Sequence, residues 1–276
     1  MRIFPLVFLV LVLGSCAAKK ENLANPPGYN LAAPVVIKLP LELDEISGVT
    51  FYPTDTSLFA ITDELGLIYK ITPGPQTAVN KWKFADPGDY EEVVLIDSVF
   101  YVLESGGSIA SVKFVESGSA IRKDHLFPYG EKNEFESLYY DSTSKKLVMV
   151  CKDCDIDKKK KLSTFTFDPV TNEFSDRSFS INIDELAVRM KTEIFRFKPS
   201  AANQHPITGD IYIISAINEI LLITDRNGKI KGFYPLDSGI FKQPEGLCFT
   251  NTGKMIITNE AADVGTANIL IYDFKK

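Results

Sequence analysis

Histidine, tryptophan and net positive charge are scarce in this chain. Its 276 residues include two histidines and one tryptophan, and 30 Lys and Arg stand against 36 Asp and Glu. Neutralising nucleic-acid phosphates takes clustered Lys and Arg, so this acidic composition argues against a nucleic-acid partner. We expect the one basic run, residues 158–161, to be a solvated loop.

Catalytic signatures are missing as well. The sequence contains no Gly-x-Ser-x-Gly elbow, no phosphate-cradling glycine loop and no EF-hand calcium loop. The two histidines, His125 and His205, fall in a presumed outer strand and in a turn, which gives nucleophilic catalysis little support. A hydrolase built on this chain would have to rely on a bound metal.

The N-terminus has the organisation of a lipoprotein signal peptide. Arg2 precedes an apolar run from Ile3 to Leu13, which is shorter than the roughly 20 residues that span a bilayer. Small residues then lead to Cys16, as in a lipobox. We expect residues 1–15 to be removed and Cys16 to be lipidated. The protein would then be exported and anchored in the bacterial cell envelope, at the outer membrane or facing the periplasm.

Residues 16–33 are expected to form a flexible tether. They contain Pro26-Pro27-Gly28 and lack apolar periodicity. The folded domain is then expected to cover residues 34–276.

Five short segments repeat along this domain. Their second residues are separated by 44, 45, 64 and 45 positions, and a period near 45 is that of a four-stranded propeller blade. The segments are Ile46–Val49, Tyr90–Val93, Phe135–Leu138, Pro199–Ala202 and Pro244–Leu247.

Short β-rich runs follow each segment as second and third strands. Fourth strands are expected at residues 80–84, 121–127, 174–181 and 230–234, but the chain ends before the last repeat can form one. Residues 35–40 can supply it, and pairing the two ends of the chain would close the ring and remove exposed sheet edges. The sequence therefore predicts an all-β fold: a five-bladed β-propeller of four-stranded antiparallel blades, with the N-terminal strand closing the last blade.

The interval of 64 residues contains an insertion of about nineteen residues over the period. Asp184–Lys191 has apolar residues at helical spacing, and Asp184 is a residue type that caps helices. We expect one short helix that decorates a blade edge, with a lid or a partner surface as the alternative.

Equivalent positions on the first strands of a propeller form a ring around the central channel. Here the ring positions are Ser47, Glu91, Glu136, Ser200 and Glu245. Two like charges about 4 Å apart cost roughly 4 kcal/mol at an effective dielectric near 20, so the three carboxylates require compensation.

Three kinds of compensation are open. A bound Ca²⁺ takes six to eight oxygen ligands, of which three Glu side chains can offer most. The carboxyl pKa values can rise instead, or a base such as Lys152 or Arg189 can lie nearby.

A second set of acids follows the second strands, whose ends should lie on the same face as the ring. Glu104 and Glu260 are the best placed to supplement it. Asp63, Glu64 and Asp153 are equally well explained as solvated turn residues.

Cys151 and Cys154 form a Cys-x-x-Cys pair, and Cys248 lies far away in sequence. In an oxidising compartment the pair could close a local disulfide. Neither a helix N-terminus nor a second cysteine pair supports a redox or zinc site.

In order and spacing, several motifs resemble those of the SdiA-regulated family. They are Glu45-Ile46-Ser47-Gly48, Asp89-Tyr90-Glu91, Asn133-Glu134-Phe135-Glu136-Ser137-Leu138, Gln243-Pro244-Glu245-Gly246-Leu247 and Ile257-Thr258-Asn259-Glu260. The resemblance implies a five-bladed propeller without an established activity and with a calcium site, which falls on Glu91, Glu136 and Glu245. Ser200 matches the small residue usual in the fourth repeat.

Two hypotheses of function follow. The first is a monomeric, non-enzymatic envelope lipoprotein whose calcium-binding propeller presents an acidic face to a protein or small ligand, with the membrane reached only through Cys16. The alternative is a calcium-dependent hydrolase of a phosphoester or lactone, which requires an open coordination position beside a ligand-sized pocket.

Overall fold

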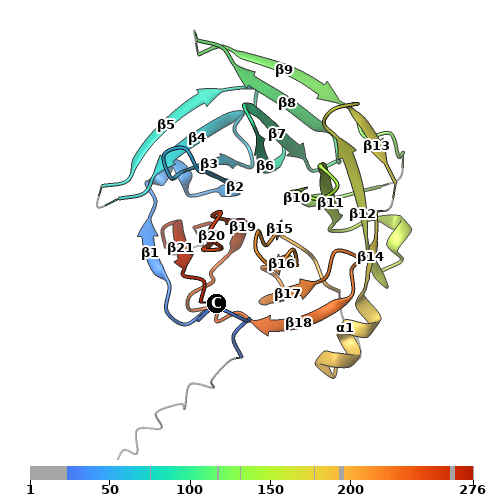
Figure 1. The fold of residues 1–276 in the computed structure, drawn as a ribbon. Coiled ribbons are helices and arrows are strands. Elements are labelled where there is room, and N and C mark those ends of the chain that lie inside the picture. Colours follow the sequence, from blue (N-terminus) through green and yellow to red (C-terminus); the bar gives the residue numbers. More distant parts are fainter. Residues whose placement is uncertain are drawn as a thin grey trace, which may run out of the picture.

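Five blades surround a central axis in the computed structural model (Figure 1). The structure describes residues 24–275 apart from Pro75, Ser117, Glu131, Arg177 and the segments 193–195 and 262–264. The expected signal peptide and Cys16 lie outside the described residues, so lipidation stays a prediction.

Each blade is an antiparallel sheet with four strand positions from the axis outward, and in three blades the four strands follow one another along the chain. The first blade contains β2 (Ile46–Tyr52), β3 (Ser57–Thr62), β4 (Leu67–Thr72) and β5 (Ala78–Lys83). The second contains β6 (Tyr90–Ile96), β7 (Val99–Glu104), β8 (Ile109–Phe114) and β9 (Ala120–His125). The fourth contains β15 (Ala201–Gln204), β16 (Ile211–Ser215), β17 (Ile220–Thr224) and β18 (Ile230–Pro235).

The third blade differs in its outer strand. It contains β10 (Phe135–Asp141), β11 (Lys146–Cys151) and β12 (Lys161–Asp168). The fourth strand predicted at 174–181 is two short strands, β13 (Glu173–Ser175) and β14 (Ser180–Asn182), which both pair with the long β12.

The two ends of the chain close the ring, as predicted. The fifth blade contains β19 (Pro244–Phe249), β20 (Met255–Asn259) and β21 (Asn268–Tyr272), and its outer strand is β1 (Val35–Lys38). In the antiparallel register of β1 and β21, Val35 faces Ile271 and Lys38 faces Asn268. The predicted five-bladed propeller is confirmed.

The second strands are apolar on both faces because each blade is covered by two neighbours. In β16, Ile211 and Ile213 pack toward the third blade, whereas Tyr212 and Ile214 pack toward the fifth. An apolar cluster of this kind fills every junction between adjacent blades. These junctions form the core and fix the blades around the axis.

Helix α1 (Ile183–Met190) lies at the outer edge of the ring, as expected (Figure 1). Its N-cap is Asn182, whose side chain accepts a hydrogen bond from the Glu185 N–H at 3.0 Å. The prediction of Asp184 as the cap was wrong by two residues, because Asn182 ends β14 and already has the extended backbone of a cap. Asp184 instead lies in the first turn, where a negative charge favours the helix dipole.

The folded domain begins before residue 34. Tyr29 and Leu31 are only 6% exposed and pack in the junction between the fourth and fifth blades. The Tyr29 hydroxyl donates to the Gly253 carbonyl at 2.5 Å and lies 2.8 Å from His205 Nε2. His205 Nδ1 accepts from the N–H groups of Ile207 and Thr208, so Nε2 carries the proton and donates to Tyr29.

The predicted tether therefore includes structured residues. A tyrosine and a leucine without periodic neighbours were enough to anchor this segment, and the sequence pattern did not reveal them. His205, which was expected in a turn, directly follows β15 and is fully buried beneath the same segment.

We predict that Tyr29→Phe lowers the free energy of unfolding by about 1–3 kcal/mol, because it leaves the buried Gly253 carbonyl and His205 N–H without their partner. Urea denaturation measures this. Tyr52→Phe is the control, since the half-buried Tyr52 hydroxyl has no hydrogen bond to the described residues. Equal losses in both variants would contradict the role given to Tyr29.

Candidate functional site

A β-bulge lies at the ring position in four of the five blades. In β6, Tyr90 pairs with Glu104 and Glu92 with Leu103, so Glu91 between them has no partner in the ladder. The same irregularity leaves Glu136 of β10 and Glu245 of β19 unpaired, and it includes Ser47 of β2. Because a bulge bends the strand and redirects a side chain, it is suited to presenting these residues to the axis.

The predicted ring carboxylates meet in one cavity, which we call the acidic pit. Its volume is about 200 Å³, and seven of its nine lining residues are acids. The lining residues are Glu45, Ile46, Ser47, Asp63, Asp89, Glu91, Glu136, Glu245 and Glu260.

The two serines of the ring connect neighbouring blades. The Ser47 hydroxyl lies at the pit and donates to the Glu91 carbonyl at 2.7 Å. The Ser200 hydroxyl donates to the Pro244 carbonyl at 2.6 Å, and Ser200 is not among the pit residues. Both hydroxyl protons are therefore used within the fold.

The second set of acids divides into two groups. Glu260 and Asp63 line the pit. Glu104 does not, because Arg122 holds it in an ion pair at 2.8 Å. Asp153 is likewise paired with Arg196 at 3.0 Å.

Two acids of the pit, Glu45 and Asp89, were not among the predicted site residues. Each lies two positions before a ring residue, as Glu134 does in the third blade. This second acidic row was readable from the repeat.

Among the described residues, Lys152 is the base that pairs with a lining carboxylate of the pit, although it is not itself a lining residue. Its ammonium group donates to the Glu136 carboxylate and lies 2.8 Å from the Glu134 carboxylate, and the side chain is only 15% exposed. Arg189, the other base considered, pairs with Glu185 on α1 instead. One of the three compensations expected from the sequence is therefore present.

Raised pKa values are a second compensation. Burial, then the charge of Asp89, raises the pKa of Glu91 to about 7. Burial, then the charge of Glu260, raises the pKa of Glu245 to about 8. The positive charge of Lys152 lowers both pKa values in part. One ammonium group does not neutralise the pit.

Glu92, which follows the ring residue Glu91, is a buried acid that does not line the pit. It is 1% exposed, and burial raises its pKa well above the ordinary value. Its Oε1 accepts from the Val93 N–H at 2.9 Å, while Oε2 has no partner among the described residues. The available signal was small residues at the equivalent positions of the other blades: Gly48, Ser137, Ala201 and Gly246.

The oxygen donors of the pit fit a hard cation, but they lie farther apart than the ligands of an assembled metal centre. Carboxylate oxygens are the ligands that Ca²⁺ prefers. Among the described residues, the acids of the pit do not bring three ligand atoms within 4.8 Å of one another. A cation would have to draw them together, and Glu136 would have to exchange Lys152 for it.

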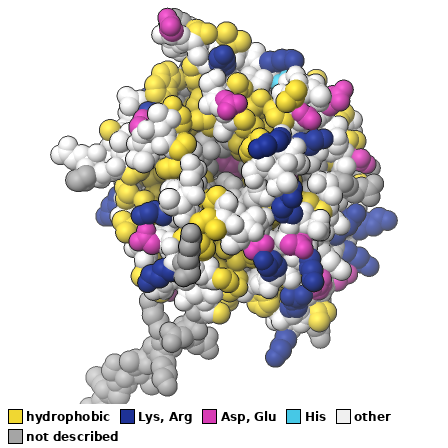
Figure 2. Space-filling view, in the orientation of Figure 1, with side chains coloured by type: hydrophobic (Ala, Val, Ile, Leu, Met, Phe, Trp, Pro, Cys, Tyr) yellow, Lys and Arg dark blue, Asp and Glu magenta, His cyan; other side chains and the backbone are white. Residues whose placement is uncertain are grey.

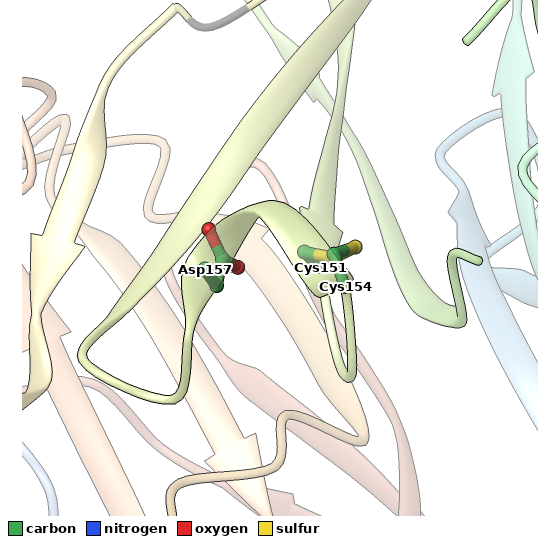
Figure 3. Close-up of side chains that lie close together, drawn as sticks. All are labelled: Cys151, Cys154 and Asp157. Atoms are coloured by element: carbon green, nitrogen blue, oxygen red, sulfur yellow. A yellow bond between two sulfur atoms is a disulfide. The ribbon is translucent and has the colours of Figure 1, made fainter. Parts of the chain in front are cut away.

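The side chains that do lie within that distance are Cys151, Cys154 and Asp157 (Figure 3). The two sulfurs are joined in a disulfide. The Asp157 carboxylate accepts from the Ser163 N–H at 3.0 Å and from its hydroxyl at 2.5 Å. This cluster is a structural staple whose groups already have partners.

Figure 2 shows one face of the ring, on which Lys and Arg side chains are scattered among acidic, polar and apolar ones. A continuous basic surface is not visible on the face shown. Within the described part of the chain, no helix has both the length and the apolar character needed to cross a membrane.

The model of the SdiA-regulated family matches residues 27–263, and no curated protein matches the chain. The fold is similar to that of glutaminyl cyclase from Myxococcus xanthus, with 12% identity, a TM-score of 0.57 and coverage of 88% of this chain and 98% of that one. PQQ-bound aldose sugar dehydrogenase from Streptomyces coelicolor is also similar in fold, with 11% identity, a TM-score of 0.57 and coverage of 91% of this chain and 100% of that one. A gluconolactonase from Xanthomonas campestris has 12% identity, a TM-score of 0.55 and coverage of 90% of this chain and 95% of that one.

The raised pKa values predict a dependence of stability on pH. In the folded chain the pKa values of Glu91 and Glu245 lie above the ordinary value of 4.5. Both side chains therefore bind protons more tightly in the folded chain than in the unfolded chain. Without divalent cations, the free energy of unfolding should therefore fall as the pH rises from about 5 to about 8, by at most about 1.4 kcal/mol per pH unit for each group. Urea denaturation in the presence of a chelator measures this.

The variant Glu91→Gln/Glu245→Gln is the comparison, since it lacks both titrations. As the pH rises across this range, the free energy of unfolding of the wild type should fall relative to that of the variant. A constant difference would contradict the assignment.

We also predict that Gly48→Ala costs about 1–3 kcal/mol of stability. A Cβ at Gly48 would lie 2.3 Å from Glu92 Oε1 and 2.5 Å from Glu92 Cα, so the backbone must move. Gly106→Ala is the matched control, because a Cβ there meets nothing within 4 Å. Thermal unfolding measures the stability of both variants. If Gly48→Ala has the same Tm as the wild type, Glu92 does not fill this space.

Proposed function

The chain belongs to the SdiA-regulated family, and from its acidic pit we propose that it is a calcium-binding propeller that serves as a binding module for a protein or small ligand. The observation that carries the proposal is the convergence of seven carboxylates on about 200 Å³, with Lys152 as the one base paired to them among the described residues. A divalent cation relieves their repulsion without protonation.

Glu91, Glu136 and Glu245 would hold the ion, with Glu260 and the lone pairs of Ser47 as further oxygen donors. The bulges present the three ring carboxylates from different blades, so a shared ion would link those blades. Calcium accepts the irregular geometry that such a site offers. When bound, the ion would supply positive charge that offsets part of the negative charge of the pit.

The proposal includes attachment to the cell envelope through Cys16, and the path of the chain suits it. Ring residues lie at the beginning of the first strands. Tyr29 binds Gly253, which lies between β19 and β20 at the opposite end of the first strand. The N-terminal segment therefore joins the propeller on the face away from the pit, and an anchored protein would turn the pit away from the lipid.

A binding function is favoured over the hydrolase alternative. The hydrolase needs a pocket that encloses its substrate, and such pockets usually measure about 300–1,000 Å³ and have apolar walls. The pit is smaller, and only Ile46 among its lining residues is apolar, so a small ligand of the binding module would have to meet the ion at the mouth of the pit. His205 is committed to Tyr29, and His125 lies 3.0 Å from the Ser111 hydroxyl in the second blade, so neither histidine serves the pit. The likeness to a gluconolactonase is one of fold.

We predict that Ca²⁺ at about a hundred times its dissociation constant stabilises the wild type by about 2.7 kcal/mol, because it binds the folded state. Scanning calorimetry with Ca²⁺ and with a chelator measures the shift in Tm. Glu91→Gln/Glu136→Gln/Glu245→Gln should show no shift.

Glu116→Gln/Glu173→Gln is the control for altered net charge, since both residues are exposed and distant from the pit. It should respond to Ca²⁺ as the wild type does. If Ca²⁺ does not change the Tm of the wild type, the proposal is wrong. Turnover in a screen of phosphoester and lactone substrates would favour the hydrolase instead.

A further inference from the structure

The base at the acidic pit is carried by a loop that a disulfide closes. Lys152 lies between Cys151 and Cys154, whose sulfurs are bonded and whose Cα atoms are 6.0 Å apart. Both cysteines are buried, with exposed fractions of 0% and 5%. The disulfide thus fixes the two ends of a segment only four residues long (Figure 3).

Further contacts hold this loop against the strand that carries Glu136. The Lys152 N–H donates to the Glu134 carbonyl at 2.8 Å, and the Glu134 N–H donates to the Asp153 carbonyl at 3.1 Å. The Asp153 carboxylate pairs with Arg196 at 3.0 Å and lies 3.5 Å from the Lys198 ammonium. The backbone of Lys152 is therefore placed beside the pit whatever its side chain binds.

The Lys152 side chain then reaches inward. It contacts the carboxylates of Glu136 and Glu134, and its charge also acts on Glu91 of the second blade and Glu245 of the fifth. Its ammonium group therefore interacts with every carboxylate of the ring. A divalent cation bound by these carboxylates would occupy the same electrostatic position.

We infer that Lys152 is a tethered counter-ion that an incoming divalent cation must displace, and that the Cys151–Cys154 disulfide keeps it in place. This inference rests on the proposed cation site. Lys152 and the ion compete for Glu136, and the loop gives the ammonium group a high local concentration at the pit. The residue therefore sets the threshold of cation concentration above which the site fills.

Calorimetric titration of the full folded chain with Ca²⁺ tests this. Lys152→Met removes the charge and keeps the length, and its dissociation constant for Ca²⁺ should be at least about tenfold lower than that of the wild type. Lys152→Arg keeps the charge and should bind more weakly than Lys152→Met. Lys81→Met, which breaks the exposed pair with Glu42, is the control and should leave the constant unchanged.

Equal dissociation constants for wild type and Lys152→Met would overturn the inference and leave the proposed function standing. Absence of Ca²⁺ binding in both would overturn the two together. Weaker binding in Lys152→Met, with the fold retained by circular dichroism, would show that Lys152 organises the site instead of competing for it, and would overturn the inference alone.

The disulfide is tested in the two backgrounds. Cys151→Ala/Cys154→Ala should lower the dissociation constant in the wild type, because the freed loop holds Lys152 less often at the pit, and should have no effect in Lys152→Met. An equal change in both backgrounds would show that the disulfide acts on the site independently of Lys152. If the double variant does not fold, the folded wild type and Lys152→Met with the disulfide reduced, confirmed by thiol titration, make the same comparison.

Discussion

Electrostatic repulsion at the axis is the constraint on which the rest of this structure depends. Closing five repeats into a ring brings equivalent first-strand positions together, and in three of them the residue is glutamate. The first strands that carry these side chains are held in place by the blade junctions. Each junction is an apolar cluster, so the interactions that stabilise the propeller also enforce the crowding of charge.

Without a metal, the chain meets this repulsion in two ways at once. Lys152 supplies one positive charge, and the pKa values of Glu91 and Glu245 rise to about 7 and 8. A cation would replace both. A divalent ion would lower the remaining electrostatic repulsion in the pit. This connects the energetics of the fold with the proposed function.

Much of this arrangement was predictable because repetition carries information that single residues do not. The period near 45 located the blades, the missing fourth strand identified β1 as the closing strand, and the ring positions identified Glu91, Glu136 and Glu245. Contacts between segments distant in sequence were not predictable. The burial of Tyr29 against His205 and the pairing of Glu104 with Arg122 depend on packing that the repeat does not specify. The repeat did place Lys152 near the ring carboxylates, but it did not distinguish Lys152 from Arg189 as the base that contacts them.

The most direct test of the account is a crystal structure of the protein grown with Ca²⁺ and measured at a wavelength at which calcium scatters anomalously. The account predicts an anomalous difference peak bounded by Glu91, Glu136 and Glu245, with the Lys152 side chain withdrawn from Glu136. A pit without such a peak at saturating Ca²⁺, with Lys152 still bound to Glu136, would contradict it.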